Sequence, residues 1–106
     1  MKNNKKYYRS LERSLYLSVQ ATIDLADAVV SLKKLRKPTS LSESFDILQE
    51  QNIIARDLTN KLVSMTGFRN VLAHGYTRVD FNRVYEILHN GLKDIEDFIE
   101  NIQKHT

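Results

Sequence analysis

The sequence predicts an all-α fold, a bundle of four helices (up to five with short pieces) packed in antiparallel order. Gly and Pro are scarce, three and one in 106 residues, whereas residues compatible with helix are plentiful. Apolar residues recur at spacings of three and four along several stretches, which is the period of a helix with one buried face. The length fits one domain, spanning residues 1–106.

The first predicted helix runs from Tyr7 to about Leu35, after a polar, basic and flexible arm at residues 1–6. Its buried stripe is apolar at helical spacing and comprises Leu11, Leu15, Val19, Ile23, Ala26 and Val30. We expect Pro38 to stop the helix, since the residue before a proline disfavours helical angles. The basic residues at 33–37 complement the helix dipole at that end.

A second stripe on the same helix is polar and comprises Arg13, Tyr16, Gln20, Asp24 and Asp27. Two interpretations are open. The stripe is either a solvated face, which is the usual case, or one wall of a polar cleft facing residues 68–76. A tyrosine and two acidic residues would also suit an interface.

A capping box predicts the start of a short second helix, with Ser40 as N-cap and Glu43 as its partner three residues later. This helix extends to about Gln51 and turns Phe45 and Leu48 inward. A break near residues 51–52 then separates it from a third helix. The inward stripe of the third helix is Ile54, Leu58, Leu62 and Met65, continued by Phe68 and Leu72.

Gly67 interrupts the third helix and indicates close helix packing or a kink, because glycine costs about 1 kcal/mol against alanine in a helix. The last helix runs from Phe81 to about Lys104, with Asp80 as its N-cap. Its apolar stripe comprises Phe81, Val84, Leu88, Leu92, Ile95, Phe98 and Ile102.

Composition excludes several kinds of site. The chain has no cysteine, so disulfides and thiolate metal sites are excluded, and its three histidines lie too far apart in sequence to suggest a metal site. We expect no cofactor. We also see no apolar run near the ~20 residues that span a bilayer and no signal peptide, so we expect a cytoplasmic protein without a membrane partner.

The net charge of +3 is unevenly distributed. Residues 1–37 contain nine Lys/Arg and three Asp/Glu, and residues 38–106 contain seven and ten. A basic first half suggests an anionic partner such as nucleic acid. From charge alone, a solvated helix with a basic arm is the favoured interpretation.

The densest group of polar residues lies in Phe68–Tyr76, at the predicted end of the third helix. Asn70 and His74 are four apart and share one helix face, and the long side chain of Arg69 can reach the same cleft. Gly75 suits the position at which a left-handed residue ends a helix. We expect the following Tyr76 to expose its hydroxyl.

These residue types suit cleavage of a phosphodiester. Histidine is a general base or acid near neutral pH, arginine binds phosphate and developing negative charge, and asparagine orients either. RNA carries its own nucleophile in the 2′-hydroxyl, so no metal is required. Each residue alone also has a structural explanation, such as a helix cap. One histidine is half of an acid–base pair, and a symmetric dimer would supply the second.

The pattern Arg69-Asn70-x-x-x-His74-x-Tyr76 resembles the R-N-x-x-x-H-x-Y motif of the HEPN domain family. It is most similar to the HepT branch, toxins paired with MntA-type nucleotidyltransferase antitoxins. The resemblance covers roughly residues 11–103 and also includes Glu12-Arg13, Ile23-Asp24-Leu25-Ala26, Pro38, Ser42-x-x-Phe45-x-x-Leu48, Asn52-Ile53-Ile54, Met65-x-Gly67-Phe68 and Val79-Asp80. HepT-like proteins usually have a further helix before the one expected here at Tyr7.

The resemblance implies a HEPN-type bundle that forms a homodimer, with Arg69, Asn70 and His74 of both chains in one composite catalytic site. It implies a toxin of a toxin–antitoxin system, a metal-independent endoribonuclease, silenced when its partner transfers AMP to Tyr76. The polar-stripe residues Arg13, Tyr16, Gln20 and Asp24 are candidates for binding the RNA substrate. The alternative is a non-catalytic helical module that docks a minimal nucleotidyltransferase. A helical interaction domain without any site ranks last.

Overall fold

The computed structural model describes the backbone of residues 5–73 and 81–105, and the side chains of residues 10, 13–67, 69 and 89–105. Within these ranges the chain forms four helices and no strand. The helices are α1 (Lys5–Leu32), α2 (Glu43–Glu50), α3 (Arg56–Ala73) and α4 (Phe81–Lys104). The predicted all-α class is therefore confirmed, and the predicted last helix has the observed bounds.

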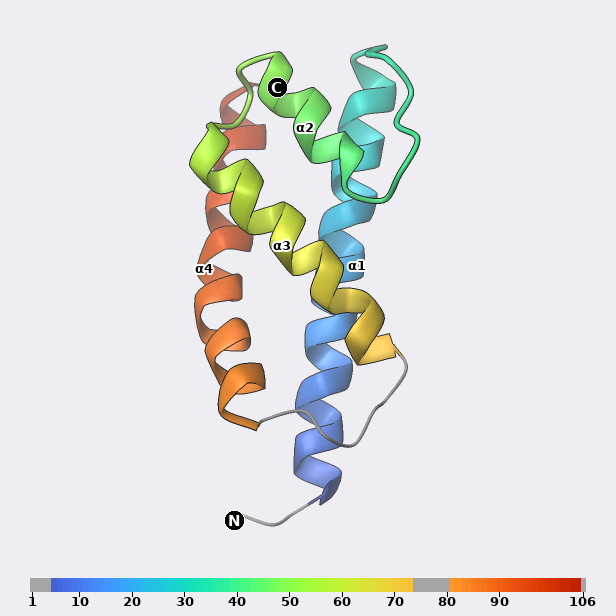
Figure 1. Cartoon of the computed structure of the whole chain (residues 1–106). Helices are drawn as coiled ribbons and strands as arrows, with labels where there is room; N and C mark the ends of the chain where they lie inside the picture. Colours follow the sequence, from blue (N-terminus) through green and yellow to red (C-terminus); the bar gives the residue numbers. More distant parts are fainter. Residues whose placement is uncertain (1–4, 74–80, 106) are drawn as a thin grey trace.

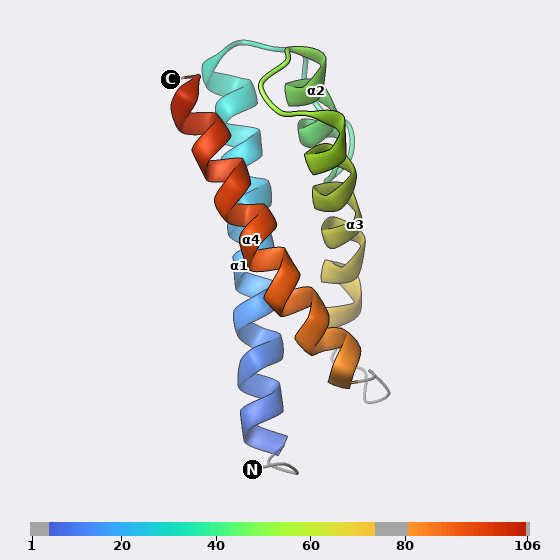
Figure 2. The ribbon, with the colours of Figure 1, turned by 90° about the vertical axis from the view of Figure 1, so that its left-hand side faces the viewer.

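The four helices form an elongated bundle in which α1 runs the full length (Figure 1). Residues 33–42 return along the bundle before the short α2 begins, so α3 runs antiparallel to both α1 and α4. Figure 2 shows α4 crossing α1 obliquely, in the same chain direction. As a result, the C-terminal half of α3 lies against the middle of α1, and the first turns of α1 extend beyond it (Figure 1).

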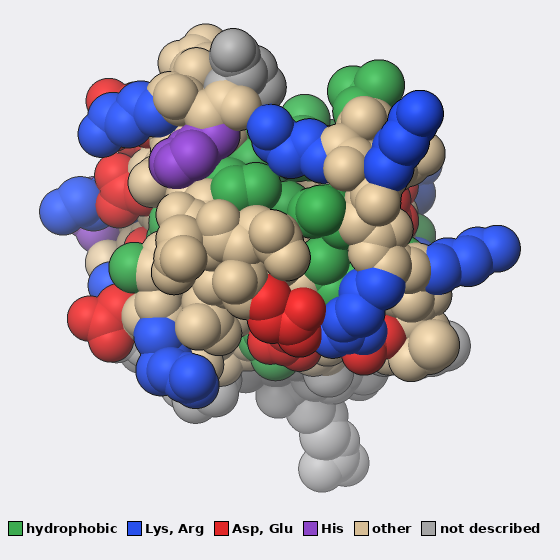
Figure 3. Space-filling model, turned by 90° about the horizontal axis from the view of Figure 1, so that it is seen from above, with side chains coloured by type: hydrophobic (Ala, Val, Ile, Leu, Met, Phe, Trp, Pro, Cys, Tyr) green, Lys and Arg blue, Asp and Glu red, His purple; other side chains and the backbone are tan. Residues whose placement is uncertain are grey.

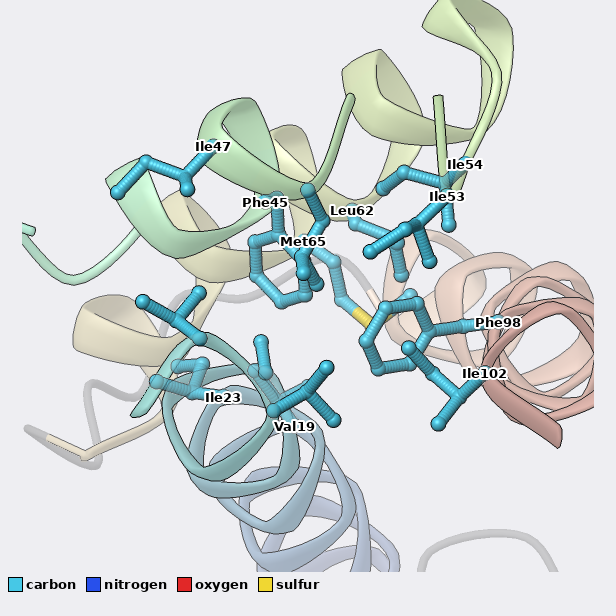
Figure 4. Packing of buried hydrophobic residues seen from close by; sticks show 14 of the residues in the cluster. Val19, Ile23, Phe45, Ile47, Ile53, Ile54, Leu62, Met65, Phe98 and Ile102 are labelled. Carbon is cyan, nitrogen blue, oxygen red and sulfur yellow. The ribbon is translucent and has the colours of Figure 1, made fainter. Parts of the chain in front are cut away.

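The core lies where all four helices meet (Figure 4). The rings of Phe45 in α2 and Phe98 in α4 form an edge-to-face pair, with centroids 5.5 Å apart and planes at 76°. Such pairs stabilise a fold by about 0.5–1.5 kcal/mol beyond the burial of their area. The described part of the predicted α1 stripe is buried around this pair, namely Leu15, Val19, Ile23, Ala26 and Val30.

Of the two interpretations of Gly67, close packing is not found among the described residues, where Gly91 is the glycine at a close helix contact. A Cβ on Gly91 would lie 3.3 Å from Cε of Met65, whereas one on Gly67 would meet no described atom within 4 Å. The buried line of α4 passes through Gly91, Phe98 and Ile102. Leu92 is therefore turned outward and 45% exposed, contrary to its predicted place in the stripe.

The helix α1 ends before Pro38 can act on it, which corrects the predicted end near Leu35. Lys34 adopts a left-handed conformation, with φ 55°. The N–H groups of Lys34 and Leu35 donate to the carbonyls of Ser31 and Val30, both at 3.0 Å. This is the Schellman arrangement, which normally places glycine at the left-handed position. This helix end could not be predicted from residue type, because a lysine occupies the position.

The end of α2 follows the same rule and confirms the predicted break. Asn52 is left-handed with φ 61°, a conformation that asparagine tolerates better than most residues. Its N–H donates to the carbonyl of Gln49 at 2.9 Å, and Ile53 donates to Leu48 at 3.0 Å. Ile53 is buried, so the turn also anchors the connection to α3.

The predicted capping box of Ser40 and Glu43 is wrong. The helix α2 begins at Glu43 with Ser42 as its N-cap, and Ser42 makes no side-chain capping bond. The Glu43 carboxylate instead binds groups of the preceding loop. It accepts hydrogen bonds from the Thr39 hydroxyl at 2.7 Å and from the Thr39 backbone, and it pairs with Arg36 at 3.0 Å. Arg36 also pairs with Glu50 at 2.7 Å.

Acidic side chains therefore offset the basic run at the end of α1. Figure 3 views the end of the molecule at which α2 lies, and there Lys and Arg side chains alternate with Asp and Glu. This face of the molecule therefore carries charges of both signs.

One segment within α1, Arg13–Leu32, is long and apolar enough to cross a membrane by length and composition, contrary to the expectation that no such run exists. The core helix of a soluble protein passes the same test. The apolar stripe of this segment is buried against the other helices, whereas Leu17 and Leu32 are exposed.

The left-handed Lys34 generates a stability prediction. Replacing Lys34 with glycine removes the clash of Cβ with the backbone, which costs roughly 1 kcal/mol in a left-handed residue. We expect Lys34→Gly to raise the free energy of unfolding by up to about 1 kcal/mol in urea denaturation. Ser31→Gly, three residues earlier and helical, is the matched control and should lower it. A loss of stability in Lys34→Gly would contradict this account of the helix end.

The hydrogen bonds and the ion pair of Glu43 predict how the stability of the fold depends on pH. The hydroxyl of Thr39, then its backbone N–H, then Arg36, lower the pKa of Glu43 from 4.5 to about 2. Because the folded pKa lies below the unfolded one, this stabilisation is complete above pH 4.5 and is lost as the pH falls through about 2.

We therefore expect Glu43→Gln to be less stable than the wild type at pH 7, with the gap in urea midpoint closing between pH 4.5 and 2. Glu96→Gln, an exposed change in α4, is the control. If the difference in urea midpoint stayed constant over this pH range, the effect of Glu43→Gln would come from packing and not from the charge.

Candidate active site around Arg69

The described centre of the predicted motif is Arg69, which lies in the last turns of α3 and is half-buried. Its guanidinium reaches across to α1. Nε donates to Oε1 of Gln20 at 2.5 Å, and Nη2 lies 3.4 Å from the hydroxyl of Tyr16. The Cζ atom lies 5.3 Å from the centroid of the Tyr16 ring, within the range of a cation–π contact. Two residues of α1 therefore hold one cation of α3.

A third residue of α1 continues this chain of hydrogen bonds. The Nε2 group of Gln20 donates to Oδ1 of Asp24 at 3.0 Å, between neighbours four apart on the helix. The carboxylate only accepts, so the amide must turn its NH₂ to Asp24 and its oxygen to Arg69. Asp24, Gln20 and Arg69 thus form a row joined by two hydrogen bonds, each from a donor to an acceptor.

The residues of the predicted polar stripe lie in different surroundings. Tyr16 and Gln20 are half-buried and contact Arg69, as a cleft wall facing the motif requires. Asp24 is exposed and touches the motif through Gln20 alone among the bonds of described residues. Asp27 turns to the other end of the bundle, where it accepts a hydrogen bond from Ser44 of α2. Arg13 is exposed, one turn before Tyr16. Whether these residues bind a substrate stays a prediction.

The structure describes the residues around Arg69 in the motif only in part. Thr66, one helical turn before Asn70 on α3, is buried and donates to the Leu62 carbonyl of its own helix. The backbone of Asn70 is helical, but its side chain lies outside the described residues. His74, Gly75, Tyr76 and the predicted cap Asp80 also lie outside them. That Arg69, Asn70 and His74 share one cleft therefore stays a prediction.

No group of three or more His, Asp or Glu side chains that could hold a metal gathers within the part of the chain that the structure describes. What Arg69 offers chemically is a fixed cation at the end of a helix. Hydrogen bonds from its guanidinium are directional and charge-assisted, which suits a phosphate or a developing negative charge.

Comparison with known proteins identifies the family. A family model described as "Ribonuclease HepT-like" matches residues 1–102. The chain belongs to the HepT-like ribonuclease family. The mRNA nuclease HepT of Shewanella oneidensis is 32% identical to this HepT-like chain over 98 residues, which are 89% of the chain and 74% of the relative. The tRNA nuclease HepT of Aphanizomenon flos-aquae is 30% identical over 94 residues, 89% of the chain and 64% of the relative.

Solved structures agree with this assignment. A structure described as a tri-AMPylated Shewanella oneidensis HEPN toxin in complex with MNT antitoxin matches with a TM-score of 0.88 and 29% identity. The match covers 97% of the HepT-like chain and 77% of that chain. A toxin–antitoxin crystal structure with AMP-PNP matches with a TM-score of 0.89 and 28% identity, over 97% and 78%. The predicted HEPN resemblance is thus confirmed.

The contact of Tyr16 with Arg69 can be measured as a coupling energy. In a double-mutant cycle of Tyr16→Leu and Arg69→Met, followed by urea unfolding, we expect a coupling of about 0.5–1 kcal/mol, as for a partly exposed cation–π pair. Tyr16→Phe keeps the ring, and the hydroxyl bond is long, so its cycle should give a much smaller coupling. Equal coupling energies in the two cycles would mean that the Tyr16 hydroxyl, and not its ring, stabilises Arg69.

Proposed function

We propose that this chain is a toxin of a toxin–antitoxin system and cleaves RNA as a metal-independent endoribonuclease. Membership of the HepT-like ribonuclease family is the observation that carries the proposal. The two named relatives are an mRNA nuclease and a tRNA nuclease, and the similar structures are toxin–antitoxin complexes. We place it in the cytoplasm, where RNA is available, and give it no membrane partner.

The chemistry follows from the residue types. His74 takes the proton of the RNA 2′-hydroxyl, whose oxygen then attacks the adjacent phosphorus. The bond from phosphorus to the 5′-oxygen breaks, and this oxygen takes up a proton from a second acid. The products are a 2′,3′-cyclic phosphate and a 5′-hydroxyl. Arg69 binds the phosphate as its negative charge grows, and Asn70 orients the reacting groups.

The requirement for a base and an acid supports a composite site across a homodimer. One chain supplies one motif histidine, and a two-fold axis that brings two motifs together supplies the second. Arg69, Asn70 and His74 of each chain would then face one RNA strand. The fold does not oppose this arrangement, because Arg69 lies at the surface of α3 and is only half-buried.

A nucleotidyltransferase antitoxin of the MntA type would silence the site by transferring AMP to the hydroxyl of Tyr76. The support is the similar HEPN toxin, whose structure is described as tri-AMPylated and bound to an MNT antitoxin. AMP on Tyr76 adds bulk and negative charge two residues after His74. Both would repel an RNA phosphate from the cleft.

The proposal is tested with purified, unmodified dimer, with tRNA and mRNA as substrates, and with EDTA present. We expect cleavage by the wild type and a loss of at least about 100-fold in His74→Ala, the usual range for a general base. Arg69→Ala should also lose activity, because neither Gln20 nor Tyr16 carries the positive charge that offsets the growing negative charge on the phosphate. Arg56→Ala, an exposed arginine at the start of α3, is the matched control and should cleave normally.

Intact RNA after incubation with wild-type dimer would contradict the proposal. If Arg69→Ala and His74→Ala weakened binding to the nucleotidyltransferase while the wild type cleaved nothing, the chain would be a non-catalytic docking module. Circular dichroism of each variant shows that the helices remain.

A further inference from the structure

The row of hydrogen bonds from Asp24 through Gln20 to Arg69 gives Gln20 a function other than contact with the substrate. Its amide oxygen is occupied by Nε of Arg69 at 2.5 Å, and its amide nitrogen by Asp24 at 3.0 Å. Both polar ends of the side chain are thus engaged within the protein. A residue arranged in this way fixes a neighbour more readily than it binds a ligand.

We propose that Gln20 is a positioning residue for Arg69, with Asp24 setting the orientation of its amide. The proposal rests on the proposed function, in which Arg69 binds the phosphate in the transition state. A bond at Nε fixes the plane of the guanidinium, and Tyr16 lies against the same group at 5.3 Å. Together they remove rotamer freedom that a long arginine side chain would otherwise keep.

Asp24 is required because an amide has two orientations. Turned by 180°, Gln20 would present its NH₂ to the arginine cation, donor against donor. The carboxylate of Asp24 accepts only, so it holds the NH₂ on its own side. Gln20 and Asp24 are one helical turn apart on α1, and α3 contributes the third member from 49 residues away.

This proposal differs in its kinetics from direct binding of RNA by Gln20. A residue that binds substrate equally in the ground and transition states changes KM, whereas a residue that orients Arg69 for the transition state changes kcat. We expect Gln20→Leu to lower kcat about 10- to 100-fold, which corresponds to a lost hydrogen bond to a charged group. KM should stay within about two-fold.

A double substitution tests the hydrogen bonds themselves. Gln20→Glu combined with Asp24→Asn keeps the net charge and both bonds, because the new carboxylate accepts from Arg69 and the new amide at position 24 donates to it. We expect this pair to restore kcat to within about three-fold of the wild type. Gln49→Leu, a half-buried glutamine of α2, is the matched control and should cleave normally.

A readout independent of cleavage is the Nε–H resonance of Arg69 in ¹⁵N NMR of the full chain, assigned by its loss in Arg69→Lys. We expect hydrogen exchange of this proton to be at least about ten-fold faster in Gln20→Leu than in the wild type, and slow again in the double substitution. Circular dichroism checks that Gln20→Leu is folded.

The proposal is overturned if Gln20→Leu raises KM with kcat unchanged, since Gln20 then contacts RNA. It is also overturned if exchange at Arg69 is the same with and without Gln20. If the wild type itself leaves RNA intact, the proposed function fails, and the exchange rate alone then decides whether Gln20 holds Arg69.

Discussion

The packing of α3 against α1 is the constraint on which the rest of the molecule depends. It buries Leu62 and Met65 of α3 in the same core as Leu15 and Val19 of α1. The same packing carries the last turns of α3 past the polar stripe of α1, where Arg69 meets Gln20. Core and candidate site therefore form together. A change that displaced α3 from α1 would therefore also separate Arg69 from Gln20.

Much of this arrangement could be predicted from the sequence, because it depends on periodic patterns. Apolar residues at spacings of three and four defined the buried faces of α1 and α4, including Leu15, Ala26 and Phe98. The polar stripe at the same spacing predicted that Tyr16 and Gln20 share one face of α1. The motif from Arg69 to Tyr76 indicated the family, which the family match confirms.

The remaining features depend on interactions between residues that no local pattern connects. The left-handed Lys34 ends α1 through backbone bonds, although lysine is not a usual residue for this position. Glu43 bonds Thr39 rather than capping its own helix, since Arg36 and the loop compete for its carboxylate. Gly91, not Gly67, lies at the helix contact, because the partner is Met65 of another helix. The hydrogen bond between Arg69 and Gln20 likewise could not be predicted from the sequence, because its partners are 49 residues apart.

We propose that the site cleaves RNA with the substrate's own 2′-hydroxyl and without a metal. The most direct test is a short RNA of known cleavage position, compared in EDTA with the same strand carrying a single 2′-deoxy nucleotide there. We expect cleavage of the all-ribose strand, with 2′,3′-cyclic phosphate and 5′-hydroxyl ends, and an intact 2′-deoxy strand. Cleavage of the 2′-deoxy strand, or cleavage that appears only when a divalent cation is added, would contradict it.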